Sequence, residues 1–165
     1  MIEVAKAKEK DREILFLNTA TECKIHPAII EKDFWVCVTL DYLFNYCKWK
    51  EQLAFKGGTS LSKVYKVIER FSEDIDLILD WRLLGYTNNE PWEERSGTKQ
   101  QKFIEESRDR LFLYLRDEFL PEFKKGMSNL LGMETDVFID KTDSGIVNFK
   151  YPCMYSEKSI LNLNY

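Results

Sequence analysis

The adjacent glycines Gly57 and Gly58 separate two segments of different periodicity, and this break constrains the fold more than any other feature of the chain. Residues 53–55 form a short apolar run, which is typical of a buried strand, and residues 60–69 have the spacing of an amphipathic helix. Glycine lacks a Cβ, so it can adopt positive φ and bring the backbone close to another group. The sequence therefore predicts a strand that turns sharply into a helix at this point.

The start of this helix has the features of an anion site. A helix N-terminus presents free N–H groups, and Thr59 and Ser60 add hydroxyl donors. Lys63 lies in the first turn, where the helix dipole disfavours a cation, so a bound anion would explain its position. Taken alone, the glycine pair is weak evidence, because an ordinary strand-to-helix turn also uses glycine, and the spacing is not that of a P-loop.

The two faces of the helix at 60–69 differ in character. One face should pack against the core and the other should be basic. The apolar face carries Leu61, Val64, Tyr65 and Ile68, and the basic face carries Lys63, Lys66 and Arg70.

Residues 74–80 alternate in a way that predicts a strand with one acidic face. Asp74 and Asp76 would leave the same face with Cα atoms about 6.6 Å apart. At about 6 Å and an effective dielectric of about 20, two carboxylates repel by roughly 3 kcal/mol unless a cation lies between them. Mg²⁺ is the natural cation, because it takes carboxylate oxygens together with substrate phosphates. The alternative is a solvated strand with scattered acids.

The remaining patterns predict a mixed α/β (α+β) fold, in which helices flank a mixed β-sheet in the order α-α-β-α-β-α-β-β, with a short further strand. The chain length of 165 residues favours a single domain over residues 1–165. A long polar connection at 81–97 is expected to be a lid or a binding loop. We expect helices at 5–23, 27–46, 60–69 and 98–119, the last bent or broken by Pro121, and strands at 53–55, 74–80, 134–140, 146–151 and 160–163.

The helix at 27–46 is apolar on several sides and should be buried at the centre. Asp33 lies inside one of its apolar stripes, where an unpaired carboxylate is costly. Its partner could be Lys56 or Arg70, or it could reach solvent at the edge of the helix.

Composition excludes several classes of protein. A net charge of −4 disfavours binding of nucleic acid over the whole surface, so any such contact must be local. The four cysteines form no C-x-x-C pair, and His26 is isolated, so buried reduced thiols are expected rather than a zinc site. The N-terminus has no apolar signal core, and no apolar run approaches the roughly 18 residues of a membrane span, so we expect no membrane partner and a reducing cytoplasm.

The ordered combination of glycine pair, basic helix face and D-x-D strand resembles the nucleotidyltransferase fold, and more narrowly the AbiEii/AbiGii toxin family. Members carry a K-G-G-T-S/A-L run and an R-F-S-E-D-I/L-D run, which correspond to residues 56–61 and 70–76 here. Residues 30–35 are similar to the upstream E-K-D-aromatic element of the family.

The resemblance implies a toxin that binds a nucleoside triphosphate (NTP) with Mg²⁺ and, in some relatives, transfers its nucleotide to an RNA acceptor such as tRNA. It also implies a cognate antitoxin. By position, Asp74 and Asp76 would be catalytic and bind Mg²⁺. The nucleotide would be held by Gly57, Gly58, Thr59, Ser60 and Lys63.

One departure from the family pattern concerns the C-terminal part. Members usually continue with a V-K-L-E-type strand that supplies another carboxylate, followed by a helical region, so this chain is expected to be an amino-terminal portion or a shortened member. Asp136 and Asp140 are the in-chain substitutes for that carboxylate. Two alternatives stay open: a catalytically silent nucleotide-binding or interaction module, and a generic α/β domain without a nucleotide function.

Overall fold

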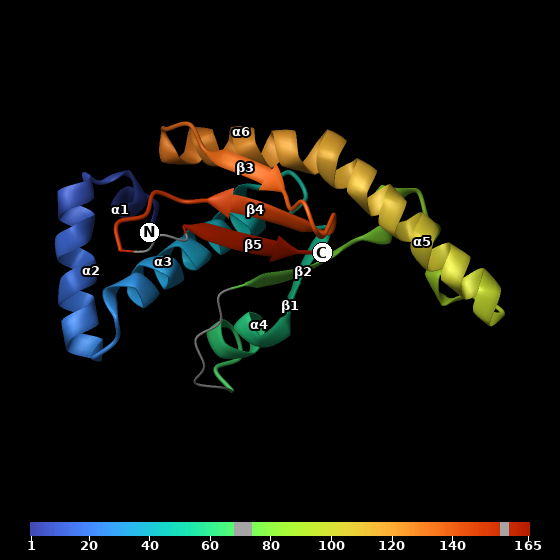
Figure 1. Ribbon diagram of the computed structural model, residues 1–165, viewed down its shortest axis with the longest axis horizontal. Helices are drawn as coiled ribbons and strands as arrows, with labels where there is room; N and C mark the ends of the chain where they lie inside the picture. The colour runs from blue at the N-terminus through green and yellow to red at the C-terminus, as the bar shows by residue number, and fades with distance from the viewer. Residues whose placement is uncertain (68–73, 156–158) are drawn as a thin grey trace.

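A five-stranded mixed sheet lies at the centre of the computed structural model, which describes residues 1–67, 74–155 and 159–165 (Figure 1). The strands are β1 (Leu53–Lys56), β2 (Ile75–Leu79), β3 (Asp136–Ile139), β4 (Ile146–Lys150) and β5 (Ile160–Asn164). The α-helices are α1 (Ile2–Lys6), α2 (Glu9–Cys23), α3 (Pro27–Asp41), α4 (Gly57–Lys63), α5 (Gly97–Tyr114) and α6 (Leu120–Leu131). The predicted mixed α/β class is confirmed.

The strand order β1-β2-β5-β4-β3 places the last strand of the chain in the middle of the sheet. β5 pairs in parallel with β2 on one side and antiparallel with β4 on the other. The β1–β2 and β3–β4 pairs are antiparallel. Figure 1 shows the C-terminus ending beside β2, so residues at the end of the chain lie next to the acidic strand.

Helices α3 and α6 cover one face of the sheet. Trp35 on α3 and Phe123 on α6 both contact Phe149 of β4, with ring centroids 6.4 and 6.2 Å away. Trp35 is fully buried and also stacks on Tyr151 at 5.9 Å, which confirms that this helix is central. On the opposite face, Ile78 of β2 is 48% exposed, so that side of the sheet remains accessible.

The helix after the glycine pair is shorter than predicted. It ends at Lys63, and its packing side is formed by the buried residues Thr59 and Ser60. The prediction that its apolar face packs is wrong for the three described members, because Leu61, Val64 and Tyr65 are 45%, 61% and 67% exposed. The fourth member, Ile68, lies outside the described residues, as does Arg70 of the basic face.

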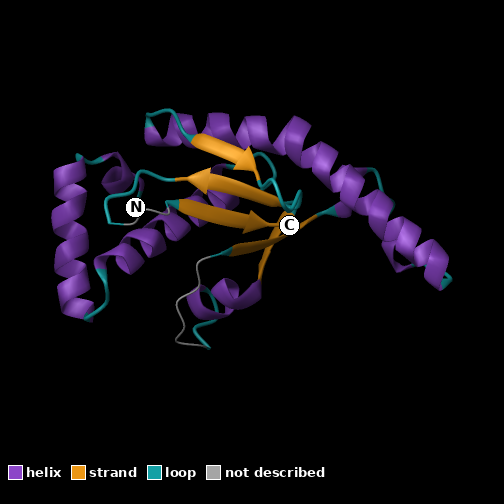
Figure 2. Ribbon diagram, in the orientation of Figure 1, coloured by secondary structure: helices purple, strands orange, loops and turns teal. Residues whose placement is uncertain are grey.

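The long helical segment in the second half of the chain bends close to Pro121, in agreement with the prediction. A π-helical turn over Leu115–Phe119 joins α5 to α6, and Pro121 sits in the first turn of α6. Proline has no N–H to donate, and its ring clashes with the carbonyl four residues earlier, so the wider turn accommodates it without ending the helix. Figure 2 shows α5 and α6 as one long bent helix, of which the α6 half runs along the sheet and the α5 half extends beyond it.

Other expected elements also formed with small shifts. The expected helix at 5–23 is divided into α1 and α2. The four cysteines carry reduced thiols, as predicted, but the prediction that they are buried holds only for Cys47, because Cys23 is exposed and Cys37 and Cys153 are half-buried. Within the described ranges, no helix combines the length and the apolar character needed to cross a membrane.

Candidate functional site

The glycine pair and the acidic strand meet at the start of α4. Gly57 has φ +74°, a conformation that favours glycine, and a Cβ built on it would lie 2.7 Å from Cγ of Asp76 and would overlap its Oδ2. Glycine is therefore required here for two reasons, the backbone conformation and the space that Asp76 occupies. The structure thus brings Gly57 of the glycine pair and Asp76 of the acidic strand next to each other.

Thr59 connects α4 to the residue before β2 by a hydrogen bond. Its Oγ1 donates a hydrogen bond of 2.6 Å to the backbone carbonyl of Asp74, and its side chain is fully buried. Ser60 is buried as well, at 5% exposure. The hydroxyl group of Thr59 therefore stabilises the fold through this hydrogen bond. Gly57 and Gly58 form the accessible part of the turn.

Asp76 is flanked by one residue from each neighbouring strand. Lys56 of β1 stands opposite it in the antiparallel pair, and Asn164 of β5 stands beside it in the parallel pair. Asn164 Nδ2 donates a hydrogen bond of 3.1 Å to Asp76 Oδ1. Both Asp74 and Asp76 are half-buried, and Lys56 is exposed. Sequence reasoning assigned no site role to Lys56 or Asn164; Lys56 already stood in the glycine motif, whereas only the strand pairing reveals Asn164.

Lys63 pairs with Asp33 of α3, with Nζ and Oδ1 2.5 Å apart. The prediction that Lys56 or Arg70 is the partner of Asp33 is therefore corrected, and Arg70 lies outside the described residues. Burial lowers the pKa of Lys63, but the hydrogen bond to Asp33 and the nearby Cys37 outweigh it, so the pKa is raised. Burial also raises the pKa of the Cys37 thiol. The positive charge of Lys63 is thus largely balanced by Asp33.

The E-K-D-aromatic element distributes its side chains to different parts of the fold. Glu31 is fully buried and accepts hydrogen bonds from the backbone N–H groups of Met154 and Tyr155, at 2.8 and 3.1 Å. Asp33 holds α4, and Trp35 lies in the core. One turn of α3 therefore anchors both the helix after the glycine pair and the segment that leads to β5.

The described residues contain no cluster of three or more His, Cys, Asp or Glu side chains placed to hold a metal. Asp136 and Asp140 cannot supply the missing acid, because β3 lies at the opposite edge of the sheet with β4 and β5 between it and β2. Asp140 instead accepts hydrogen bonds from Thr142 and Asn148. At β2, the carboxylate of Asp76 and the amide group of Asn164 lie within hydrogen-bonding distance. Carboxylate and amide oxygens are ligand types that Mg²⁺ accepts, so these residues fit a Mg²⁺ ion.

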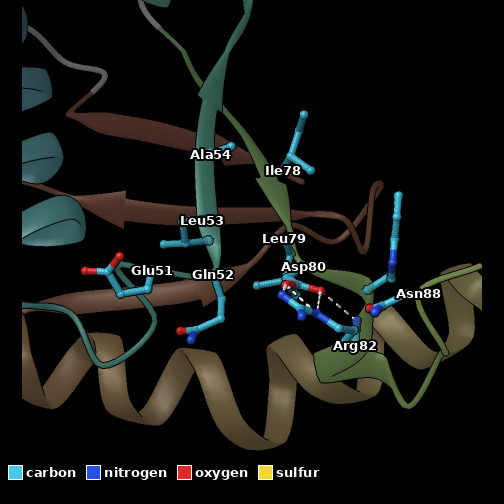
Figure 3. Close-up of a pocket in the computed structure, with 10 residues that line it drawn as sticks. Glu51, Gln52, Leu53, Ala54, Ile78, Leu79, Asp80, Arg82 and Asn88 are labelled. Carbon is cyan, nitrogen blue, oxygen red and sulfur yellow. Dashed lines mark hydrogen bonds and ion pairs between the residues drawn. The ribbon is translucent and has the colours of Figure 1, made fainter.

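A hollow of about 490 Å³ lies on the accessible side of β1 and β2 (Figure 3). Its walls include Glu51 and Gln52 before β1, Ile78 on β2, and Asp80 with Arg82 after β2. Nε of Arg82 donates to both carboxylate oxygens of Asp80 at 2.9 and 2.8 Å, and this hydrogen bonding lowers the pKa of Asp80. Because Arg82 balances Asp80, Glu51 leaves an excess of negative charge in the lining, which is unfavourable for a polyphosphate.

These features define the class of the protein: a mixed sheet in which a glycine turn meets a D-x-D strand is the arrangement of a nucleotidyltransferase-like fold. Residues 40–163 match the family described as "Nucleotidyl transferase AbiEii toxin, Type IV TA system", and the chain belongs to this family. The resemblance noted from the motifs is thus confirmed. Membership implies a nucleotidyltransferase toxin of a toxin–antitoxin system and a cognate antitoxin partner. No curated protein and no solved structure matches the chain.

Proposed function

We propose that this protein is a metal-dependent nucleotidyltransferase that binds an NTP and transfers its nucleotide to an acceptor such as tRNA. The observation that carries the proposal is the contact between Gly57 and Asp76, which brings the glycine turn and the carboxylate of Asp76 to one place. Residues 1–165 would act as one domain, in the cytoplasm, where NTPs, Mg²⁺ and tRNA are present. The cognate antitoxin would restrain this activity.

The roles of the residues follow from their positions. Gly57 and Gly58 expose backbone N–H groups to the triphosphate, and the exposed Lys56 adds positive charge beside Asp76. Asp74 and Asp76, with the amide of Asn164, would hold Mg²⁺, which neutralises phosphate charge when it is bound. Thr59 and Lys63, assigned to the nucleotide from the sequence, support the site instead, because each is engaged with a neighbouring element.

The transfer is a substitution at the α-phosphorus. The acceptor hydroxyl oxygen forms a bond to this phosphorus while the bond to the bridging oxygen of pyrophosphate breaks, and pyrophosphate leaves with the electron pair. The hydroxyl proton passes to solvent water. The chain contributes the alignment of the acceptor, the α-phosphate and the leaving group, which is the main source of catalysis in phosphoryl-type transfers.

A catalytically silent nucleotide-binding module is the second candidate function. It is favoured by the absence of a third acidic side chain next to Asp74 and Asp76 among the described residues. In that case the chain would bind an NTP without turnover.

Labelling of total tRNA with radioactive NTPs and Mg²⁺ tests the proposal. The wild-type protein should label RNA, and Asp76→Asn should not, because the isosteric amide removes the charge at the contact with Gly57. Asp80→Asn, which lies on the same side of β2 beyond the site, is the matched control and should label normally. Equal labelling by wild-type protein and Asp76→Asn would overturn the assignment, whereas NTP binding in calorimetry without labelling would favour the silent module.

A further inference from the structure

A second hollow, of about 350 Å³, opens where β2 runs past the end of β5. The β2–β5 pair covers Ile75 and Asp76, and β5 ends at Asn164. Beyond that point, α5 and the segment after β2 close over the strand, leaving a space lined by aromatic and aliphatic side chains. The aromatic members that project from these elements are Trp81, Tyr86 and Phe103.

The rings in this hollow are held in place before any ligand binds. Arg110 lies over the ring of Tyr86 at 4.4 Å, and Arg95 lies over the ring of Phe103 at 4.0 Å. The hydroxyl of Tyr86 is also hydrogen-bonded to Ser107, at 2.9 Å. A rigid aromatic wall loses little conformational entropy when a planar ligand stacks on it. Aromatic side chains accept any base by stacking, because every base has a π-face.

The hollow is lined by residues that neighbour Asp76 in the sheet. Lys56 lines its mouth and stands directly opposite Asp76 in the sheet. Ile78 also lines it and follows Asp76 by two residues on the same strand, a separation of about 7 Å between Cα atoms. A ligand with phosphates at Asp76 would therefore extend its next group into this space.

Charge distinguishes this hollow from the one in Figure 3. Its charged lining residues, among those that the structure describes, are the cations Lys56 and Arg108. The hollow in Figure 3 carries Glu51 together with the ion pair of Asp80 and Arg82, so its lining has an excess of negative charge. A nucleotide is an anion with an apolar planar base, so its two parts match the cationic mouth and the aromatic wall. The volume falls in the range of small-molecule sites.

We propose that this hollow receives the base and ribose of the NTP, with the base against Trp81 and Phe103, behind which the buried Tyr86 packs. This assignment rests on the proposed function, because the phosphates must lie at Gly57 and Asp76 for the base to reach the wall. The segment after β2, predicted from the sequence to be a lid or a binding loop, would thereby form part of the nucleotide site.

The test compares the dissociation constants of an NTP and of inorganic triphosphate, measured by calorimetry with the whole chain. The wild-type protein should bind the NTP tighter by about tenfold or more, the size expected for one stacked base. In Ile104→Trp, which fills the hollow, this difference should disappear while triphosphate binding is unchanged. Ile104 is 37% exposed, so the larger side chain can be accommodated without disturbing the core. Asn88→Trp, placed in the hollow of Figure 3, is the matched control and should keep the difference.

The outcomes separate the inference from the proposed function. Equal affinity of the wild-type protein for both ligands overturns the base site alone, and this result needs no variant. Retention of the NTP preference by Ile104→Trp also overturns it. If neither ligand binds the wild-type protein, the proposed function fails together with the inference.

Discussion

The carboxylate of Asp76 occupies the space into which a side chain at Gly57 would project. Gly57 and Asp76 are 19 residues apart in the sequence. Each nevertheless limits which side chain the other position can carry. Any residue with a Cβ at position 57 must move Asp76 or leave the positive-φ conformation. Even the methyl group of an alanine at position 57 should therefore disturb the site.

Gly57→Ala should lower the free energy of unfolding by about 1–3 kcal/mol, because the new methyl group adds both backbone strain and overlap with Asp76. Urea denaturation measures this change. Gly97→Ala is the control, since nothing lies within 4 Å of a Cβ built there, and its effect should stay within about 0.5 kcal/mol. Similar effects of the two substitutions would contradict the contact between Gly57 and Asp76.

Asp33→Asn should lower stability near neutral pH by roughly 0.5–1 kcal/mol, a value kept small because the pair with Lys63 is partly exposed. The pKa of Lys63 is raised above its ordinary value of 10.5. The stabilisation that the pair of Lys63 and Asp33 gives the folded state is therefore complete below pH 10.5. It is lost as pH rises through the higher pKa that Lys63 has in the folded state.

Urea denaturation from pH 7 to 12 checks this prediction, with Cys37→Ser in both proteins so that the neighbouring thiol does not titrate in the same range. The difference in stability between the protein that retains Asp33 and the protein with Asp33→Asn should shrink at the alkaline end. A difference that is constant over the whole range would show that the ion pair does not contribute.

Asn164→Asp should increase the affinity for Mg²⁺ by about tenfold, because it adds a third carboxylate beside Asp76. Without metal, the same change replaces a hydrogen bond by repulsion and should lower the unfolding temperature. Calorimetric titration with Mg²⁺ and thermal unfolding with and without Mg²⁺ measure the two effects. Asn89→Asp is the control, because it adds the same charge in an exposed loop and should change neither the Mg²⁺ affinity nor the unfolding temperature. An unchanged Mg²⁺ affinity in Asn164→Asp would place the metal elsewhere.

Glu31→Gln should weaken the attachment of residues 153–155 to α3, because an amide group offers one acceptor where the carboxylate offers two. The expected loss is about 1–3 kcal/mol, since a partly buried backbone N–H is left without its partner. Hydrogen exchange at the amides of Met154 and Tyr155 should accelerate. Glu22→Gln on the exposed side of α2 is the control, and equal protection in both variants would exclude the anchoring role.

Much of the fold was predictable because its signals are local. The alternation at 74–80, the apolar run before Gly57 and the apolar character of α3 each follow from short-range periodicity, and each element formed where expected. The helix after Gly58 was the exception. Its spacing indicated an apolar packing face, but the tertiary structure buries Thr59 and Ser60 instead and leaves Val64 exposed.

The sequence by itself determined that a glycine turn, a basic segment and two aspartates follow one another on a strand–helix–strand unit, because side-chain size and periodicity act within a few residues. Tertiary structure alone decided which groups complete the site. The parallel pairing of β5 with β2 places Asn164 beside Asp76, and the approach of α3 to α4 assigns Lys63 to Asp33. Such pairings depend on burial of surfaces from distant parts of the chain, which no local pattern specifies.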